Sequence, residues 1–147
     1  MKPRTLLAVV AAAVSFNAAA AQDWQLVQAD AEQLTFVDRA RIAKNEVAAS
    51  MWVLESFAHA QYIGDNTYQH RSRSLHYVFN CAERTYALSE WVMYDGTLGH
   101  GEIAWANWVG VPTFLKVEAG DREAALLAAA CGDSVLANQS YPAPALN

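Results

Sequence analysis

The chain has 147 residues, of which 54% are hydrophobic and 17% are charged, a length that suits a single domain. Its 10 basic and 15 acidic residues give a formal net charge of −5. This balance argues against a nucleic-acid partner, because binding to phosphates needs clustered Lys and Arg. Two cysteines are too few for an all-cysteine zinc site or a disulfide-dense scaffold.

The first residues have the layout of an export signal. Lys2 and Arg4 precede an apolar run over 5–14, and small residues lead to Ala19-x-Ala21. This order predicts a signal peptide over 1–21 that is cleaved before Gln22. We therefore expect an exported protein, periplasmic or secreted, with one domain over 22–133 and a flexible tail over 134–147. No cysteine follows the signal to carry a lipid anchor, and no later stretch is long and apolar enough for an integral membrane span.

The first half of the domain is predicted to be β-rich. Short strands are expected over 24–28 and 34–37, a helical turn over 38–42, and a long strand over 47–57. In that strand Met51, Val53 and Phe57 share one face. The cluster Gly64-Asp65-Asn66 is typical of a turn, so residues 60–71 are predicted to form a loop.

The second half begins with the clearest alternation of the chain. Over 73–81, Leu75, Tyr77, Phe79 and Cys81 point one way and the intervening polar residues point the other. Further strands are expected over 85–94 and 102–111, the latter stopped by Pro112. The period then changes to that of a helix over 122–131, begun by Asp121 and ended by Gly132.

The helix places Ala124, Leu127, Ala128 and Cys131 on one face at helical spacing. The predicted fold is therefore α+β, an antiparallel β-sheet with a C-terminal helix packed on it. Cys81 and Cys131 are 50 positions apart, and in an oxidising compartment such a pair favours a structural disulfide. Two buried free thiols or a redox pair are the alternatives, although redox pairs usually read C-x-x-C, which is absent.

Motifs for chemistry are largely missing. The chain has no nucleophile elbow, phosphate-binding loop or dinucleotide fingerprint, so we predict no enzyme, no catalytic residues, no cofactor and no metal site. The scattered His59, His70, His76 and His100 are interpreted as surface histidines. The basic groups over 39–44 and 71–84 are interpreted as solvated loop charges, and Trp105 and Trp108 as core residues.

A family resemblance adds to this interpretation. The stretch Phe79-Asn80-Cys81-Ala82-Glu83-Arg84, then Tyr86-Ala87-Leu88-Ser89, then Tyr94-Asp95-Gly96 and finally a helix ending in Cys131 is similar to the surface-adhesin protein E-like family. The resemblance covers about 24–132. It implies an antiparallel sheet with a helix cross-linked to it by the disulfide, and adhesion to extracellular proteins. No motif marks a binding surface, so no binding residues are predicted.

The leading functional hypothesis is a non-catalytic exported binding module for an extracellular or envelope protein. Two alternatives stay open. One is a periplasmic accessory or structural domain that forms a homodimer through an edge strand. The other is a small-ligand protein that uses a pocket in the sheet.

Overall fold

The computed structural model describes residues 22–132. The predicted signal peptide (1–21) and tail (134–147) lie outside the described residues. The elements are β1 (Trp24–Ala29), β2 (Gln33–Asp38), the 3₁₀ turn η1 (Arg39–Arg41), β3 (Ala43–Lys44), β4 (Ala48–Ile63), β5 (Tyr68–Asn80), β6 (Thr85–Tyr94), β7 (Ile103–Trp108), β8 (Leu115–Lys116) and the helix α1 (Arg122–Cys131).

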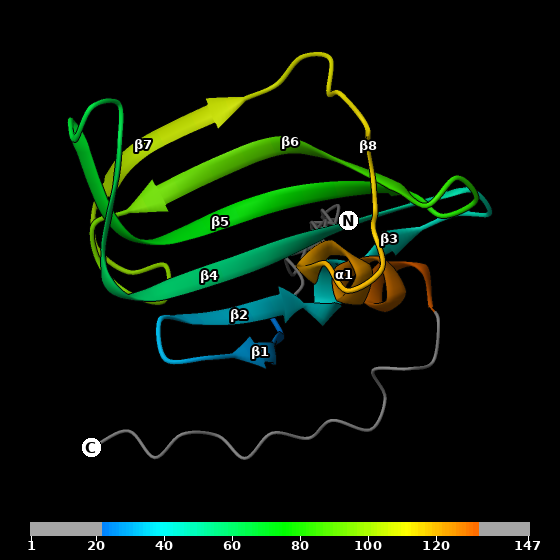
Figure 1. Ribbon diagram of the computed structural model, residues 1–147, viewed down its shortest axis with the longest axis horizontal. Coiled ribbons are helices and arrows are strands. Elements are labelled where there is room, and N and C mark those ends of the chain that lie inside the picture. The colour runs from blue at the N-terminus through cyan, green and yellow to red at the C-terminus, as the bar shows by residue number, and fades with distance from the viewer. Residues whose placement is uncertain (1–21, 133–147) are drawn as a thin grey trace, which may run out of the picture.

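These strands form one antiparallel sheet, as predicted. Its order is β1-β2-β4-β5-β6-β7, with β3 paired to β4 and β8 paired to β6. Along this path each strand therefore pairs with the strand that follows it in the chain, except that the two-residue β3 lies between β2 and β4 in sequence and pairs off the path. Figure 1 shows the curved sheet, with β7 along its upper border and α1 lying beside β3 and β4.

The sheet has two unlike faces. The face that packs against α1, called here the helix face, carries the core, because α1 contributes Leu126, Leu127 and Ala130 to one cluster with the strand residues Val37, Ala49, Met51, Val53, Leu75, Tyr77 and Phe79. The opposite face, called here the outer face, carries the residues between them, such as Trp52 and His76. This division confirms the alternation predicted for β4 and β5.

The helix begins and ends where the sequence predicts, but it turns a different side to the sheet. Its buried residues are Leu126, Leu127 and Ala130, in place of the predicted stripe through Ala124, Leu127, Ala128 and Cys131. The stripe is displaced because an Ala-rich helix has no strongly apolar side. Its orientation follows from burying both leucines.

The loop predicted over 60–71 is wrong. β4 continues to Ile63 and β5 begins at Tyr68, so the two strands form a long hairpin around a short turn. Gly64, Asp65 and Asn66 all adopt positive φ, a conformation that Gly, Asn and Asp tolerate best. The turn therefore lies where the sequence predicts it, but the aromatic and β-branched residues on both sides of it extend the strands.

The strand predicted over 102–111 is shorter than expected. β7 occupies only Ile103–Trp108, and the chain then leaves the sheet before it returns as β8. The connection holds Gly110 and Pro112. Since proline cannot donate to a ladder and glycine weakens a strand, the interruption falls where these residues lie.

The predicted disulfide is present. Cys81 follows β5 and Cys131 ends α1, and their sulfurs are 2.08 Å apart with Cα atoms at 5.8 Å, within the usual range for a disulfide. It ties the end of the helix to the sheet. Within residues 22–132, no helix has both the length and the apolar composition to cross a bilayer.

Candidate functional site

The edge strand β7 is the first candidate surface. Its sequence, Ile-Ala-Trp-Ala-Asn-Trp, holds no charged residue and no proline, two of the devices that protect edge strands from pairing with other chains. From Trp105 to Trp108 it pairs with β6 without irregularity. No described strand lies on its other side. Within residues 22–132, no strand pairs with the backbone groups on that side.

Large apolar side chains follow this edge. Among the described residues, the three most exposed large hydrophobic side chains are Val111 at 88%, Trp108 at 71% and Ile103 at 63%, and Phe114 and Leu115 are exposed as well. The opposite edge strand, β1, is also uncharged, but its large side chains are half-buried. We call Ile103, Trp108, Val111, Phe114 and Leu115 the β7 edge surface. Such a run of exposed apolar residues is typical of an interaction site.

The prediction that Trp108 lies in the core is wrong, whereas Trp105 is partly buried and so comes closer to its predicted position. Trp105 is half-buried and contacts Trp91, with ring centroids 5.8 Å apart. The spacing of these two residues in the sequence already indicates that they differ. Residues three apart in a strand lie on opposite faces, so Trp105 and Trp108 cannot both enter the core on one face of the sheet.

A row of side chains crosses the outer face and ends at Trp108. Trp52 lies opposite His76, His76 opposite Glu90, and Glu90 opposite Trp108. Since cross-strand partners project to the same face, these four form one line from β4 to the β7 edge. His76 hydrogen-bonds through Nδ1 to the hydroxyl of Ser89 at 2.7 Å.

At the far end of this row an arginine is enclosed by tryptophans. The Arg41 guanidinium lies 5.4 Å from the Trp52 ring centroid and 5.7 Å from that of Trp24. Its Nε donates to the buried carboxylate of Asp38 at 2.5 Å. Burial alone would raise the pKa of Asp38, but hydrogen bonds from the Asp23 N–H and from Arg41 hold that pKa below its usual range.

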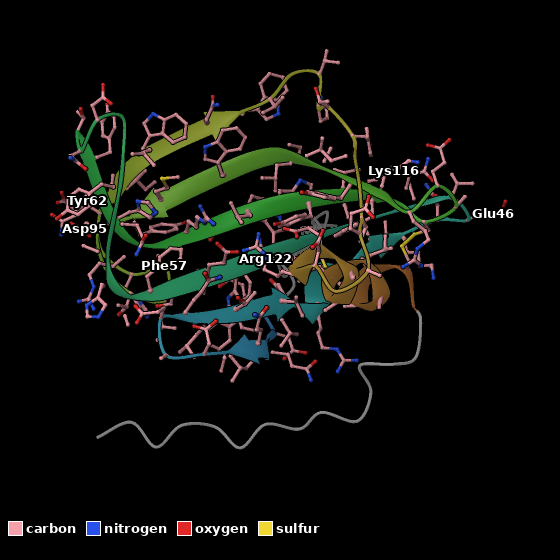
Figure 2. The ribbon with its side chains drawn as sticks, in the orientation of Figure 1. Glu46, Phe57, Tyr62, Asp95, Lys116 and Arg122 are labelled. Atoms are coloured by element: carbon pink, nitrogen blue, oxygen red, sulfur yellow. A yellow bond between two sulfur atoms is a disulfide. The ribbon has the colours of Figure 1, made fainter. Side chains whose placement is uncertain are left out.

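A buried charge cluster holds the start of α1 on the helix face. The fully buried carboxylate of Glu55, on β4, accepts hydrogen bonds from Arg73 of β5 and from Arg122 of α1. Arg122 also donates to Glu123 and to the Tyr77 hydroxyl. Figure 2 shows Arg122 at the start of α1, over the middle of the sheet.

The cluster is fully paired and therefore structural. Burial, assisted by the nearby carboxylates, raises the pKa of the Tyr77 hydroxyl. Burial works against ionised Glu123, but the hydrogen bond and the charge of Arg122 lower the pKa of that carboxyl. At neutral pH the Tyr77 hydroxyl is therefore neutral and the Glu123 carboxylate is ionised, so neither of these two groups is in an unusual protonation state for proton transfer.

The predictions for the basic residues and histidines need correction. Arg41 and Arg73 are not solvated loop charges, since both pair with buried carboxylates. His70 is not a surface residue: it is 2% exposed, packs edge-on against Phe57, and has no hydrogen-bond partner among the described residues on either ring nitrogen. Burial, followed by the charge of Arg73, lowers the pKa of His70.

A shallow cavity of about 370 Å³ lies where the β1–β2 turn meets β4 and the β6–β7 connection. Its lining includes Leu34, Phe57, Leu98 and Arg71, together with the acidic residues Asp30 and Glu32. Asp30 is occupied by the N–H groups of its own turn, and Arg71 donates to the Ala58 carbonyl. Within residues 22–132, no group of three or more potential metal-ligating side chains comes together.

Comparison with known proteins gives consistent results. The model of the Surface-adhesin protein E family matches residues 24–132. Among solved structures, the Se-Met form of Haemophilus influenzae protein E aligns with a TM-score of 0.54 at 16% identity, over 67% of this chain and 79% of that one. Crystal form II of the same protein gives a TM-score of 0.52 at 13% identity, over 67% and 80%.

Protein E from non-typeable Haemophilus influenzae aligns with a TM-score of 0.51 at 15% identity, over 77% of this chain and 88% of that one. At these identities the solved structures show a shared fold only. No curated protein matches the chain. The family match spans nearly all the described residues, the whole sheet and its disulfide-linked helix included, and on this ground the chain belongs to the Surface-adhesin protein E family.

Proposed function

We propose that this protein is an exported, non-catalytic adhesin-like module that binds an extended segment of an extracellular or envelope protein along β7. The observation that carries the proposal is the exposed and uncharged edge of β7, continued by apolar side chains through Leu115. An extended segment that adds to such an edge gains main-chain hydrogen bonds, and side-chain pockets give the pairing its specificity.

The signal-like residues 1–21 support export, and so does the disulfide, which is stable in an oxidising compartment. N-terminal sequencing of the exported protein should begin at Gln22. Accumulation of the 147-residue precursor in the cytoplasm would contradict this part of the proposal.

The binding part is tested with one pair of matched variants. Ala106→Lys puts a charge on the exposed side of β7, and Ala29→Lys puts the same charge on the other edge strand, β1. The exported protein is applied to an immobilised basement-membrane matrix, and binding is followed by surface plasmon resonance. We expect Ala106→Lys to weaken binding at least tenfold, and Ala29→Lys to leave it within twofold. Absence of binding by the unmodified protein, or equal binding by the two variants, would refute the proposal.

A further inference from the structure

Two ends of the same row on the outer face are built from the same groups. At one end, a carboxylate (Asp38) and two indole rings (Trp24 and Trp52) enclose the guanidinium of Arg41. At the other end, a carboxylate (Glu90) lies directly opposite an indole ring (Trp108). The first end shows which group this combination accepts, a guanidinium stacked on indole and paired with a carboxylate.

The second end has no cation of its own. Among the described residues, the Glu90 carboxylate makes no hydrogen bond or ion pair, and its charge acts on the nearby His76 imidazole. Burial lowers the pKa of His76, so that imidazole is neutral at neutral pH and does not compensate the charge of Glu90. Trp108 is 71% exposed and lies at the open border of the sheet.

We infer that the extended segment bound by β7 carries an arginine that stacks on Trp108 and pairs with Glu90. This inference rests on the proposed docking at β7. The next position of the row falls on the added strand. It lies one strand spacing from Trp108 and two strand spacings, about 10 Å, from Glu90. Extended Arg and Glu side chains together span that distance. The acidic balance of the chain, −5 overall, draws a basic segment toward this edge.

A second copy of this chain fits the position poorly. Neither β7 nor the connection that follows it to Leu115 contains Arg or Lys, so pairing of two β7 strands brings no cation to Glu90. It also brings two acidic molecules together. The observations therefore favour a different, basic segment over a homodimer through this edge.

The test uses a synthetic nonapeptide of alternating threonine and valine with arginine at its centre, capped at both ends. Its partner peptide carries citrulline, a neutral analogue of arginine, in the same position. Binding to the exported protein is followed by Trp fluorescence and calorimetry. We expect the arginine peptide to bind about tenfold more tightly, a difference of about 1.4 kcal/mol. The difference should vanish in Glu90→Gln and in Trp108→Leu.

Glu83→Gln is the matched control, because it removes the same charge from the exposed β5–β6 turn, outside the row; the preference for arginine should survive in it. If both peptides bind equally and Ala106→Lys abolishes both, the edge docks a segment but the arginine inference is wrong. If neither peptide binds, edge docking itself fails. Concentration-dependent dimers in sedimentation experiments that Ala106→Lys disrupts would make a second copy the occupant and overturn the inference.

Discussion

Arg122, the first residue of the helix, donates a hydrogen bond to the buried carboxylate of Glu55 in the middle of β4. Arg73 approaches the same carboxylate from β5, its Nε 2.5 Å from Glu55 Oε2. The contact between Arg122 and Glu55 joins residues that are 67 positions apart in the chain. It fixes the N-terminal end of α1 on the sheet, as the disulfide fixes its C-terminal end.

The charge cluster should respond strongly to loss of its central carboxylate. Glu55→Gln leaves Arg73 and Arg122 without their shared counter-charge, and breaking a buried ion pair costs about 3 kcal/mol. We expect a loss of this size in the free energy of unfolding from urea titration. The exposed control Glu102→Gln should change the free energy by less than about 0.5 kcal/mol. Equal losses in the two variants would contradict a structural role for the cluster.

The disulfide should account for a comparable share of stability. Replacing both cysteines, Cys81→Ala with Cys131→Ala, opens a link across 50 positions, for which the chain-entropy model gives about 4 kcal/mol. Reducing agent should lower the melting temperature of the unmodified protein and leave that of the double variant unchanged. If oxidised protein and variant melt at one temperature, the link does not stabilise the fold.

Stability should fall as the pH drops below the ordinary range of histidine. The folded pKa of His70 lies below its usual value of about 6.5, because burial and Arg73 oppose its charged form. The unfolded chain therefore binds the proton first, so the stabilisation is complete above about pH 6.5 and declines as the pH falls toward the folded pKa. His76, whose pKa is lowered mainly by burial, contributes in the same direction.

Substitution isolates the part due to His70. His70→Phe keeps an aromatic ring against Phe57 and removes the titrating group, so the dependence of unfolding free energy on pH should become flatter. His59→Gln, at an exposed position, should keep the slope of the unmodified protein. A slope unchanged in His70→Phe would show that this imidazole does not link acid to unfolding.

Alanine substitutions at two glycines can distinguish the cost of backbone strain from the cost of a steric clash. Gly101 and Gly120 have nearly the same positive φ, +91° and +93°. A Cβ on Gly101 would lie 2.0 Å from Asp95 Oδ1 and 2.9 Å from the Gly96 nitrogen, whereas nothing lies within 4 Å of a Cβ on Gly120. Gly120→Ala should therefore cost about 1 kcal/mol, from strain alone.

Gly101→Ala should cost about 2 kcal/mol more than Gly120→Ala. The added methyl group would displace the Asp95 carboxylate, which accepts a hydrogen bond from the Glu102 N–H at 2.8 Å. Urea titration of both variants measures the difference. If the two losses were equal, the turn before β7 would be able to rearrange around the methyl group.

Period-two alternation was enough to predict the strands that form the core. Leu75, Tyr77 and Phe79 face the helix as expected, and the cysteine at the end of this series forms the predicted disulfide. The helix was placed correctly, but its buried side was not. Eight of its ten residues are Ala, Leu or Cys, and they lie on every side of the helix. The contacts of Arg122 and the two leucines therefore decide the orientation, and these contacts depend on distant strands.

The candidate site was harder to predict. The exposure of Trp108 depends on β7 being the last strand of the sheet, a property of topology that local composition does not contain. The burial of His70 without a hydrogen-bond partner among the described residues likewise depends on the long β4–β5 hairpin. The turn residues around Gly64 led to the prediction of a loop there instead of this hairpin. Glu55 gave a usable signal, since a single carboxylate within a run of buried residues requires a cationic partner, but the sequence does not say which arginines supply it.

The two attachments of α1 differ in what releases them. Reductant cuts the sulfur link at Cys131 and leaves the contact of Arg122 with Glu55 in place, while strong acid neutralises carboxylates and leaves the sulfur link intact. One kind of environmental stress alone therefore detaches only one end of the helix.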